Sequence, residues 1–165
     1  MIIYENIFRA FQEQRVKYVL VGGIAVNLLG SLRSTADMDI LVEMQDDNLA
    51  KVVTILKNKG YRVKQPVDPI GLADRETRED WIKNKHMKAF NFYKDGGIKE
   101  VDIIIDTPVS FKEANKDALR VKSGGIIIPV ISIDKLIKMK KKSGRNIDKL
   151  DIEELNRIKK LRKRK

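Results

Sequence analysis

The chain has 165 residues, with 34 Lys and Arg against 23 Asp and Glu, one histidine and no cysteine. This length suits one domain, or a compact domain with a small appendage, and an apolar share of 42% excludes a disordered chain. The absence of cysteine excludes disulfide frameworks, thiol catalysis and thiolate metal sites. A single histidine also argues against a histidine-rich metal centre.

The apolar segments are short. The longest, Tyr18–Leu29, is interrupted by Asn27 and falls below the roughly 20 residues that a membrane span needs. The first six residues lack the basic start and the long apolar core of a secretory signal. We therefore expect a cytoplasmic protein that does not bind membranes.

The positive charge is concentrated at the C-terminus. Residues 135–165 hold 14 basic and 4 acidic side chains, so they carry +10 of the net charge of +11. Such a segment can attract RNA or tRNA, or concentrate nucleotides, because both are polyanions. It can equally be a solvated helix face, and the sequence leaves both interpretations open.

The first half of the chain alternates between helix and strand patterns. Ile7, Phe8 and Phe11 share one helical face, and a β-branched run ends at Gly22-Gly23. These patterns predict, in chain order, a helix over 4–14, a strand over 17–22, a helix over 24–29, a strand over 37–43, a helix over 46–58 and a short strand over 61–63.

The second half continues the mixture and closes with helices. We expect a loop over 66–73, a helix over 74–85, a hairpin of strands 87–93 and 99–105, a short helix over 111–117, strands over 118–121 and 126–130, and helices over 133–142 and 147–163. The fold class is therefore α+β, with a catalytic core over 1–130 and a basic helix-loop-helix over 131–165 that packs on it.

A glycine pair and two aspartates carry the chemistry. Gly22-Gly23 lies where a strand turns into a helix, so backbone N–H groups there can approach a phosphate closely. Asp37 and Asp39 share one face of the following strand, and their mutual repulsion favours a divalent cation. All-oxygen ligation selects Mg²⁺ or Mn²⁺. Arg33 can add a charge-assisted contact to the same phosphates.

Each feature alone has a structural explanation. A glycine pair commonly forms a turn, and Asp-x-Asp at the start of a strand can cap it or face solvent. Here 13 residues separate Gly23 from Asp37, which allows a helix and a return loop, so that both ends can meet at one edge of a sheet. The combination predicts a site for a metal and a nucleoside triphosphate.

These motifs resemble a known superfamily. Val21-Gly-Gly-Ile-Ala, Gly30, Arg33, Thr35 and Asp37-Met-Asp-Ile-Leu-Val are similar to the signature of the DNA polymerase β-like nucleotidyltransferases. The Gly-Gly and Arg-x-Thr-x-Asp-x-Asp forms are most similar to the branch of abortive-infection-type toxins and lincosamide-type antibiotic nucleotidyltransferases. Ile133–Lys140, Gly144-Arg145, Asp148 and Asp151 resemble the helix-loop-helix that closes this branch.

The resemblance implies a mixed sheet flanked by helices, and a metal-dependent transfer of a nucleoside monophosphate from NTP to a hydroxyl with release of pyrophosphate. It implies Asp37, Asp39 and Asp102 as catalytic and metal-binding residues. The nucleotide-binding residues would be Gly22, Gly23, Arg33, Ser34, Thr35, Lys140 and Arg145. Asp148 and Asp151 are expected to pair with these cations at the start of the last helix.

Two aspartates of the strand over 99–105 and the residue after it are candidates for the third carboxylate. Asp102 and Asp106 lie on one face of the strand at about 13 Å from each other, so both cannot serve one centre. The superfamily's hydrophobic-Asp-hydrophobic strand favours Asp102, with Asp106 as the fallback. A half-exposed hairpin strand without a catalytic role is the alternative.

The sequence is consistent with more than one acceptor for the nucleoside monophosphate. A toxin-like enzyme would modify RNA, such as a tRNA end, or a protein, and a resistance-like enzyme would modify a small antibiotic. A non-catalytic domain of the same fold would bind nucleotide, RNA or a protein partner, as an antitoxin does. We also expect His86 at the surface, and Trp81, Phe90 and Phe92 in the core, unless Trp81 is exposed and stacks on a base.

Overall fold

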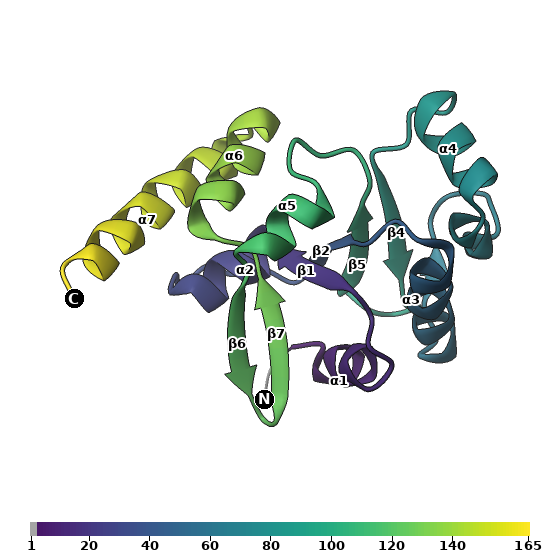
Figure 1. The fold of residues 1–165 in the computed structure, drawn as a ribbon, viewed down its shortest axis with the longest axis horizontal. Coiled ribbons are helices and arrows are strands. Elements are labelled where there is room, and N and C mark those ends of the chain that lie inside the picture. The colour runs from purple at the N-terminus through teal and green to yellow at the C-terminus, as the bar shows by residue number, and fades with distance from the viewer. Residues whose placement is uncertain (1–2) are drawn as a thin grey trace.

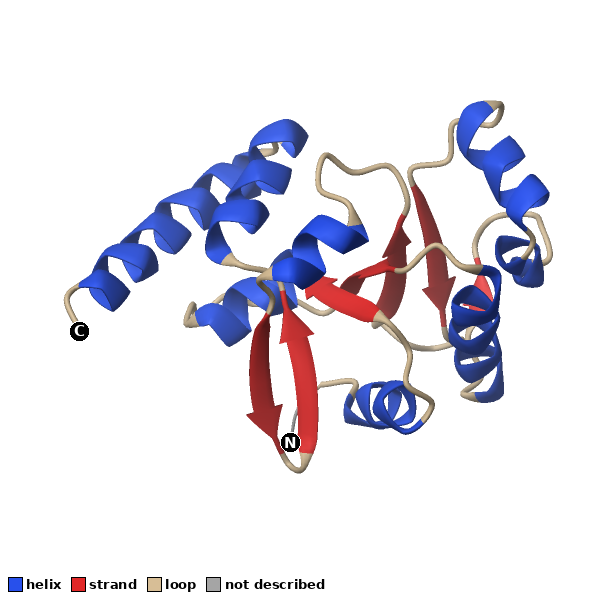
Figure 2. Ribbon diagram, in the orientation of Figure 1, coloured by secondary structure: helices blue, strands red, loops and turns tan. Residues whose placement is uncertain are grey.

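The computed structural model describes residues 3–165 and combines helices with a single sheet (Figure 2). The helices are α1 (Glu5–Glu13), α2 (Gly22–Leu29), α3 (Asp46–Asn58), α4 (Arg75–Lys83), α5 (Phe111–Lys116), α6 (Ile133–Ser143) and α7 (Asn146–Lys163). The strands are β1 (Tyr18–Val21), β2 (Met38–Val42), β3 (Arg62–Val63), β4 (Ala89–Tyr93), β5 (Glu100–Ile104), β6 (Leu119–Ser123) and β7 (Ile126–Val130). The predicted α+β class is confirmed.

The sheet is mixed, and its topology brings distant segments to one edge. The strand order is β3-β4-β5-β2-β1-β7-β6. β2 runs parallel to β5 and antiparallel to β1, while β1 runs parallel to β7. The ends of β1 and β7 therefore meet the starts of β2 and β5. Gly22, Asp39, Asp102 and the chain leading into α6 consequently lie along the same edge of the sheet.

The core follows the predicted periodicity. The apolar faces of α1 and α3 are buried, and the two helices contact each other. Trp81 stacks on Phe90 with 5.4 Å between ring centroids, and Phe90 and Phe92 are fully buried. Trp81 is therefore a core residue, as expected, and His86 is exposed.

The segment over 66–73 is more ordered than a simple loop. It contains a 3-10 turn, η1 (Pro69–Ala73), whose first turn is capped by Asp68 accepting a hydrogen bond from the Ile70 N–H at 3.1 Å. Pro69 fixes its own φ at a value that suits a helix start. Trp81 packs against Gly71 so closely that a Cβ there would lie 2.5 Å from the ring. The turn thus depends on a tertiary contact that local sequence does not show.

The C-terminal helices pack on the rest of the molecule. α6 and α7 lie side by side, and α7 also contacts α2 (Figure 1). Leu136, Ile137, Leu155 and Ile158 are buried in the same core as the sheet. Among residues 3–165, no helix combines the length and the apolar character that crossing a bilayer requires.

Candidate active site

The glycine pair permits close packing at the start of α2. Gly22 has φ +71°, and a Cβ on it would collide with the Asp39 carboxylate. A Cβ on Gly23 would lie 2.6 Å from Thr35 Oγ1 and 3.0 Å from Arg33 Nη1. The structure therefore brings Gly22, Gly23, Arg33, Thr35 and Asp39 together. The first N–H groups of a helix lack intrahelical partners, so this point favours an anion.

The carboxylates form a row on the adjoining strands. Asp39 is in register with Asp102 on β5, and one carboxylate oxygen each from Asp37, Glu100 and Asp102 lie within 4.8 Å of one another. An all-carboxylate donor set of this size suits Mg²⁺ or Mn²⁺. Asp39 lies beside this trio, with its carboxylate packed against Gly22.

Glu100 was not among the residues expected at the site. It lies two residues before Asp102 on the same face of β5, which the alternation of the strand shows. Its proximity to Asp37 depends on the loop before β2, which the sequence does not define. Its carboxylate also forms an ion pair with Lys64 at 2.5 Å.

Burial and like charges perturb these acids. Burial, followed by the charges of Asp102 and Asp37, raises the pKa of Asp39 to about 7, although Lys140 and Arg145 oppose the shift. Burial and Asp37 also raise the pKa of Asp102, against the effect of a hydrogen bond from Asn91. Both shifts favour the protonated acids, so a bound cation would return the carboxylates to their charged form.

Tyr4 was also missed by sequence reasoning. Its hydroxyl lies 2.5 Å from the Ala36 carbonyl and 2.9 Å from the Glu100 carbonyl. It thereby ties the start of α1 to the segments that carry Asp37 and Glu100. Burial, then Tyr61 and Asp37, raises the pKa of the Tyr4 hydroxyl. No motif marks this residue, because the contact spans 96 positions in sequence.

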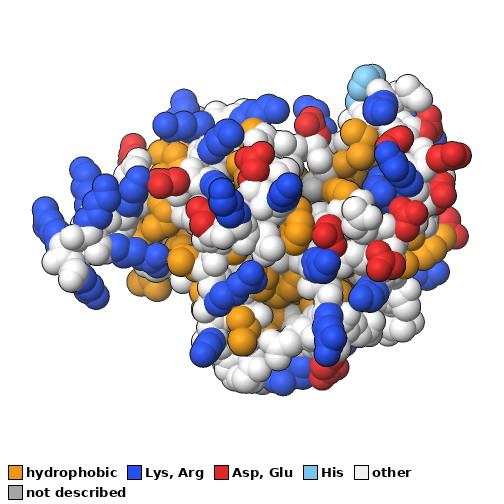
Figure 3. All heavy atoms as spheres, in the orientation of Figure 1, with side chains coloured by type: hydrophobic (Ala, Val, Ile, Leu, Met, Phe, Trp, Pro, Cys, Tyr) orange, Lys and Arg blue, Asp and Glu red, His pale blue; other side chains and the backbone are white. Residues whose placement is uncertain are grey.

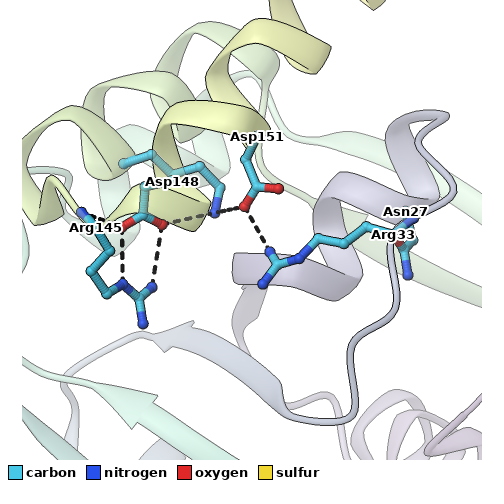
Figure 4. Close-up of polar contacts among 6 residues, drawn as sticks. Asn27, Arg33, Arg145, Asp148 and Asp151 are labelled. Atoms are coloured by element: carbon cyan, nitrogen blue, oxygen red, sulfur yellow. Dashed lines mark hydrogen bonds and ion pairs between the residues drawn. The ribbon is translucent and has the colours of Figure 1, made fainter.

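A network of ion pairs joins α6 and α7 to the loop between α2 and β2 (Figure 4). Asp151 accepts hydrogen bonds from Arg33 at 2.6 Å and from Lys140 at 2.7 Å. Asp148 accepts hydrogen bonds from Arg145 at 2.9 Å and from Lys140 at 3.5 Å. Asp148 and Asp151 therefore pair with cations, as expected.

Lys140 and Arg145, two of the three predicted cations of this network, differ in exposure. Lys140 is 6% exposed and held by both carboxylates, whereas the Arg145 side chain is 70% exposed. Burial raises the pKa of Asp148, but the hydrogen bonds it accepts from Arg145 outweigh this effect and bring it to about 2. Ser34 lies in the loop after α2 and is exposed.

A cleft of about 450 Å³ opens between this edge of the sheet and the C-terminal helices. The α2 start and Asp39 form one wall, β4 and the end of β5 a second, and α6 with the start of α7 a third. The lining residues are Val21, Gly22, Asp39, Lys88, Ala89, Ile104, Asp106, Thr107, Pro108, Leu136, Met139, Lys140, Lys142, Ser143, Arg145 and Asp148. Asp106, the fallback carboxylate, thus lines the cleft and is not a member of the Asp37–Glu100–Asp102 trio.

Sequence comparison identifies the family. The family model described as aminoglycoside-2''-adenylyltransferase matches residues 4–157, which is most of the chain. The chain belongs to this family. Its members are nucleotidyltransferases, so the expected superfamily and the transferase class are confirmed. No curated protein matches the chain at a significant level.

Solved structures with the same fold agree with this family. The lincomycin-bound lincosamide antibiotic adenylyltransferase LnuA is 20% identical with a TM-score of 0.62, and the match covers 93% of this chain and 94% of LnuA. ANT(2'')-Ia in complex with adenylyl-2''-tobramycin is 14% identical with a TM-score of 0.58, over 94% and 90% of the two chains. A protein from Thermotoga maritima described as a nucleotidyltransferase is 17% identical with a TM-score of 0.57, over 97% and 90%.

Proposed function

We propose that this enzyme transfers a nucleoside monophosphate from an NTP, with ATP as the natural donor of its family, to a hydroxyl group of a small-molecule acceptor. The proposal is supported by the placement of the phosphate-binding and metal-binding groups beside each other. The start of α2 and the Asp39 carboxylate line the cleft, and Asp39 is in register with Asp102 of the Asp37–Glu100–Asp102 trio on the neighbouring strand.

The acidic residues would hold the metal. Asp37, Asp39 and Asp102, joined by Glu100, offer only oxygen ligands. Burial, together with the charges of neighbouring carboxylates, raises the pKa of Asp39 and of Asp102, and a divalent cation would relieve that repulsion. Mg²⁺ or Mn²⁺ bound there would neutralise phosphate charge and align the triphosphate with the acceptor.

The nucleotide phosphates would lie against the start of α2. The lack of side chains at Gly22 and Gly23 lets Asp39, Thr35 and Arg33 pack closely around the first backbone N–H groups of α2. The Nε of Arg33 is buried and has no hydrogen-bond partner among the described residues, so it offers a donor to a phosphate oxygen. Arg145 can approach from the opposite wall because its side chain is largely exposed.

Asp102 would accept the proton of the acceptor hydroxyl. The hydroxyl oxygen then forms a bond with the α-phosphorus, the bond from that phosphorus to the bridging oxygen breaks, and pyrophosphate leaves. Catalysis otherwise rests on positioning and on charge neutralisation.

The charged side chains that line the cleft indicate which kind of acceptor it favours. Asp39 belongs to the metal site, and Asp148 is neutralised by Arg145 and Lys140. Asp106 is then the remaining carboxylate of the lining, which also carries the ammonium groups of Lys88 and Lys142. An acceptor with several ammonium groups, such as an aminoglycoside, would be repelled. The cleft favours an amphipathic acceptor with few positive charges.

An RNA, tRNA or protein acceptor receives less support. The basic end of α7, where Lys and Arg side chains gather in Figure 3, is compatible with a polyanion. The family and the two antibiotic enzymes named above point instead to small molecules. A purely binding, antitoxin-like role is disfavoured because the carboxylates that would hold the metal are all present.

The test is transfer of label from α-³²P-ATP in the presence of Mg²⁺. Lincomycin, tobramycin and total tRNA are offered separately, and Asp39→Asn is the inactive control. We expect a labelled antibiotic, with lincomycin preferred to tobramycin. Label on tRNA or on protein alone would contradict the small-molecule acceptor.

A further inference from the structure

Two amide side chains lie behind the Asp102 carboxylate. Asn91 on β4 is in register with Asp102, and its Nδ2 donates a hydrogen bond to Asp102 Oδ1 at 2.7 Å. Gln65, just after β3, donates from Nε2 to Asn91 Oδ1 at 2.7 Å and accepts at Oε1 from the Asn91 backbone N–H at 3.1 Å. The three side chains form one continuous chain of hydrogen bonds.

The backbone fixes the direction of this chain. A backbone N–H can only donate, so the oxygen of Gln65 must face Asn91 and its amide nitrogen must face the Asn91 oxygen. The nitrogen of Asn91 is then left for Asp102. Neither amide can be flipped without placing two donors or two acceptors against each other.

The hydrogen bonds from Asn91 and Gln65 restrain the Asp102 carboxylate, which lies beside two other acidic side chains. Asp37, Glu100 and Asp102 repel one another, and an aspartate carboxylate rotates freely about its last torsion. Lys64 holds Glu100 by an ion pair, and the next residue, Gln65, holds Asp102 through Asn91. Because Asn91 is neutral, it fixes Asp102 without cancelling its charge.

We propose that Gln65 and Asn91 are positioning residues: Asn91, held by Gln65, occupies Asp102 Oδ1 and so leaves Oδ2 free for a divalent cation or for the acceptor proton. This inference rests on the proposed function. It concerns two residues that contact each other and Asp102, and it assigns them an effect on Asp102 alone.

The test is Mn²⁺ affinity, measured by electron paramagnetic resonance on the full chain without nucleotide. The variants are Asn91→Leu and Gln65→Met, singly and together, because both are close in size to the native side chains. Loss of an outer hydrogen bond to a metal ligand weakens binding by about tenfold or more, so we expect roughly that loss for Asn91→Leu. Gln65→Met should weaken binding less, and the double variant should be no weaker than Asn91→Leu, because Gln65 acts through Asn91.

A matched control is available at Gln12. Its amide also joins two backbone groups, donating to the Gly125 carbonyl at 3.2 Å and accepting from the Ile127 N–H at 2.8 Å, away from the carboxylates. Gln12→Met should leave Mn²⁺ affinity unchanged. Thermal unfolding of every variant shows whether it is folded, and Gln65→Met tests the chain of bonds should Asn91→Leu not fold.

Two results separate this inference from the proposed function. If the native chain binds Mn²⁺ and the folded variants bind it equally well, Gln65 and Asn91 are structural only and the inference is wrong. If the native chain binds no Mn²⁺, the metal site itself is wrong, and the inference is overturned with it.

Discussion

Gly22 carries two constraints at a single residue. Its φ of +71° is costly for any residue with a side chain, and a Cβ would collide with the Asp39 carboxylate. We predict that Gly22→Ala lowers the free energy of unfolding by about 3 kcal/mol and abolishes binding of Mg·ATP, because overpacking adds to the backbone cost. Urea unfolding and calorimetric titration measure the two effects.

Gly96 supplies the matched control for that variant. Its φ of +69° is nearly the same, but no heavy atom lies within 4 Å of the Cβ position. Gly96→Ala should therefore cost only the backbone term of about 1 kcal/mol and leave nucleotide binding intact. Equal costs at the two positions would show that the collision with Asp39 does not matter.

The raised pKa of Asp39 makes stability depend on pH. An aspartate in the unfolded chain has a pKa of about 3.9. In the folded chain, burial and the charges of Asp102 and Asp37 raise the pKa of Asp39 to about 7. Between these values the folded chain binds the proton more tightly, so the free energy of unfolding falls as pH rises from about 4 to about 7 in metal-free buffer.

Asp39→Asn should remove most of that decrease. The full shift corresponds to roughly 4 kcal/mol as an upper bound, and because Asp39 is half-buried we expect the variant to be more stable than the native chain by about 2 kcal/mol at pH 8 without metal. Chemical unfolding across pH 4–8 measures this difference. An unchanged slope in the variant would contradict the electrostatic account of Asp39.

At the level of elements, the hydrophobic period was sufficient to predict the helices and strands. The Gly22-Gly23 turn and the Asp37–Asp39 spacing were also readable, because each is local to a few residues. Gln65 and Asn91 were not, since their places depend on the register of β3, β4 and β5. Glu100 and Tyr4 were not, since their contacts depend on the path of the loop before β2. Sequence periodicity predicts which face a residue occupies, but it does not predict which strand lies beside it.

Asp151 links α7 to the loop that carries Arg33. Replacing it with Asn leaves Arg33 and Lys140 with less compensation for their burial, and breaking such buried pairs costs about 3 kcal/mol or more. We predict that loss for Asp151→Asn in urea unfolding, together with faster hydrogen exchange over residues 31–37, because Arg33 is released.

Asp134 provides a matched control for the Asp151 variant. It also joins α6 to α7, through an ion pair with Lys159, but that pair is exposed. Asp134→Asn should cost less than about 1 kcal/mol and leave exchange in the loop unchanged. Similar effects for the two variants would mean that Asp151 holds the helices together without positioning Arg33.

At the scale of the whole molecule, the core extends across the predicted boundary at residue 131. Leu136, Ile137, Leu155 and Ile158 are buried with the sheet, and each buried aliphatic side chain contributes roughly 1.5–3 kcal/mol. Their sum is comparable to the about 5–15 kcal/mol that stabilises a typical domain. We therefore predict that a chain ending at Val130 does not fold cooperatively.

Circular dichroism and urea unfolding of that shortened chain test the prediction. A cooperative transition would show that residues 1–130 form an independent domain. If the shortened chain shows no cooperative transition, the helix-loop-helix over 131–165 is required for folding, and it completes both the core and one wall of the cleft.

We infer a metal-dependent nucleotide site at the edge formed by Gly22, Asp37, Asp39 and Asp102. Calorimetric titration of ATP in the presence of Mg²⁺ into the native chain and into the Asp37→Asn/Asp39→Asn double variant tests this site. We predict that the native chain binds ATP only when Mg²⁺ is present and that the double variant does not bind it. Binding of equal affinity in the two proteins, or binding that persists when Mg²⁺ is removed, would contradict it.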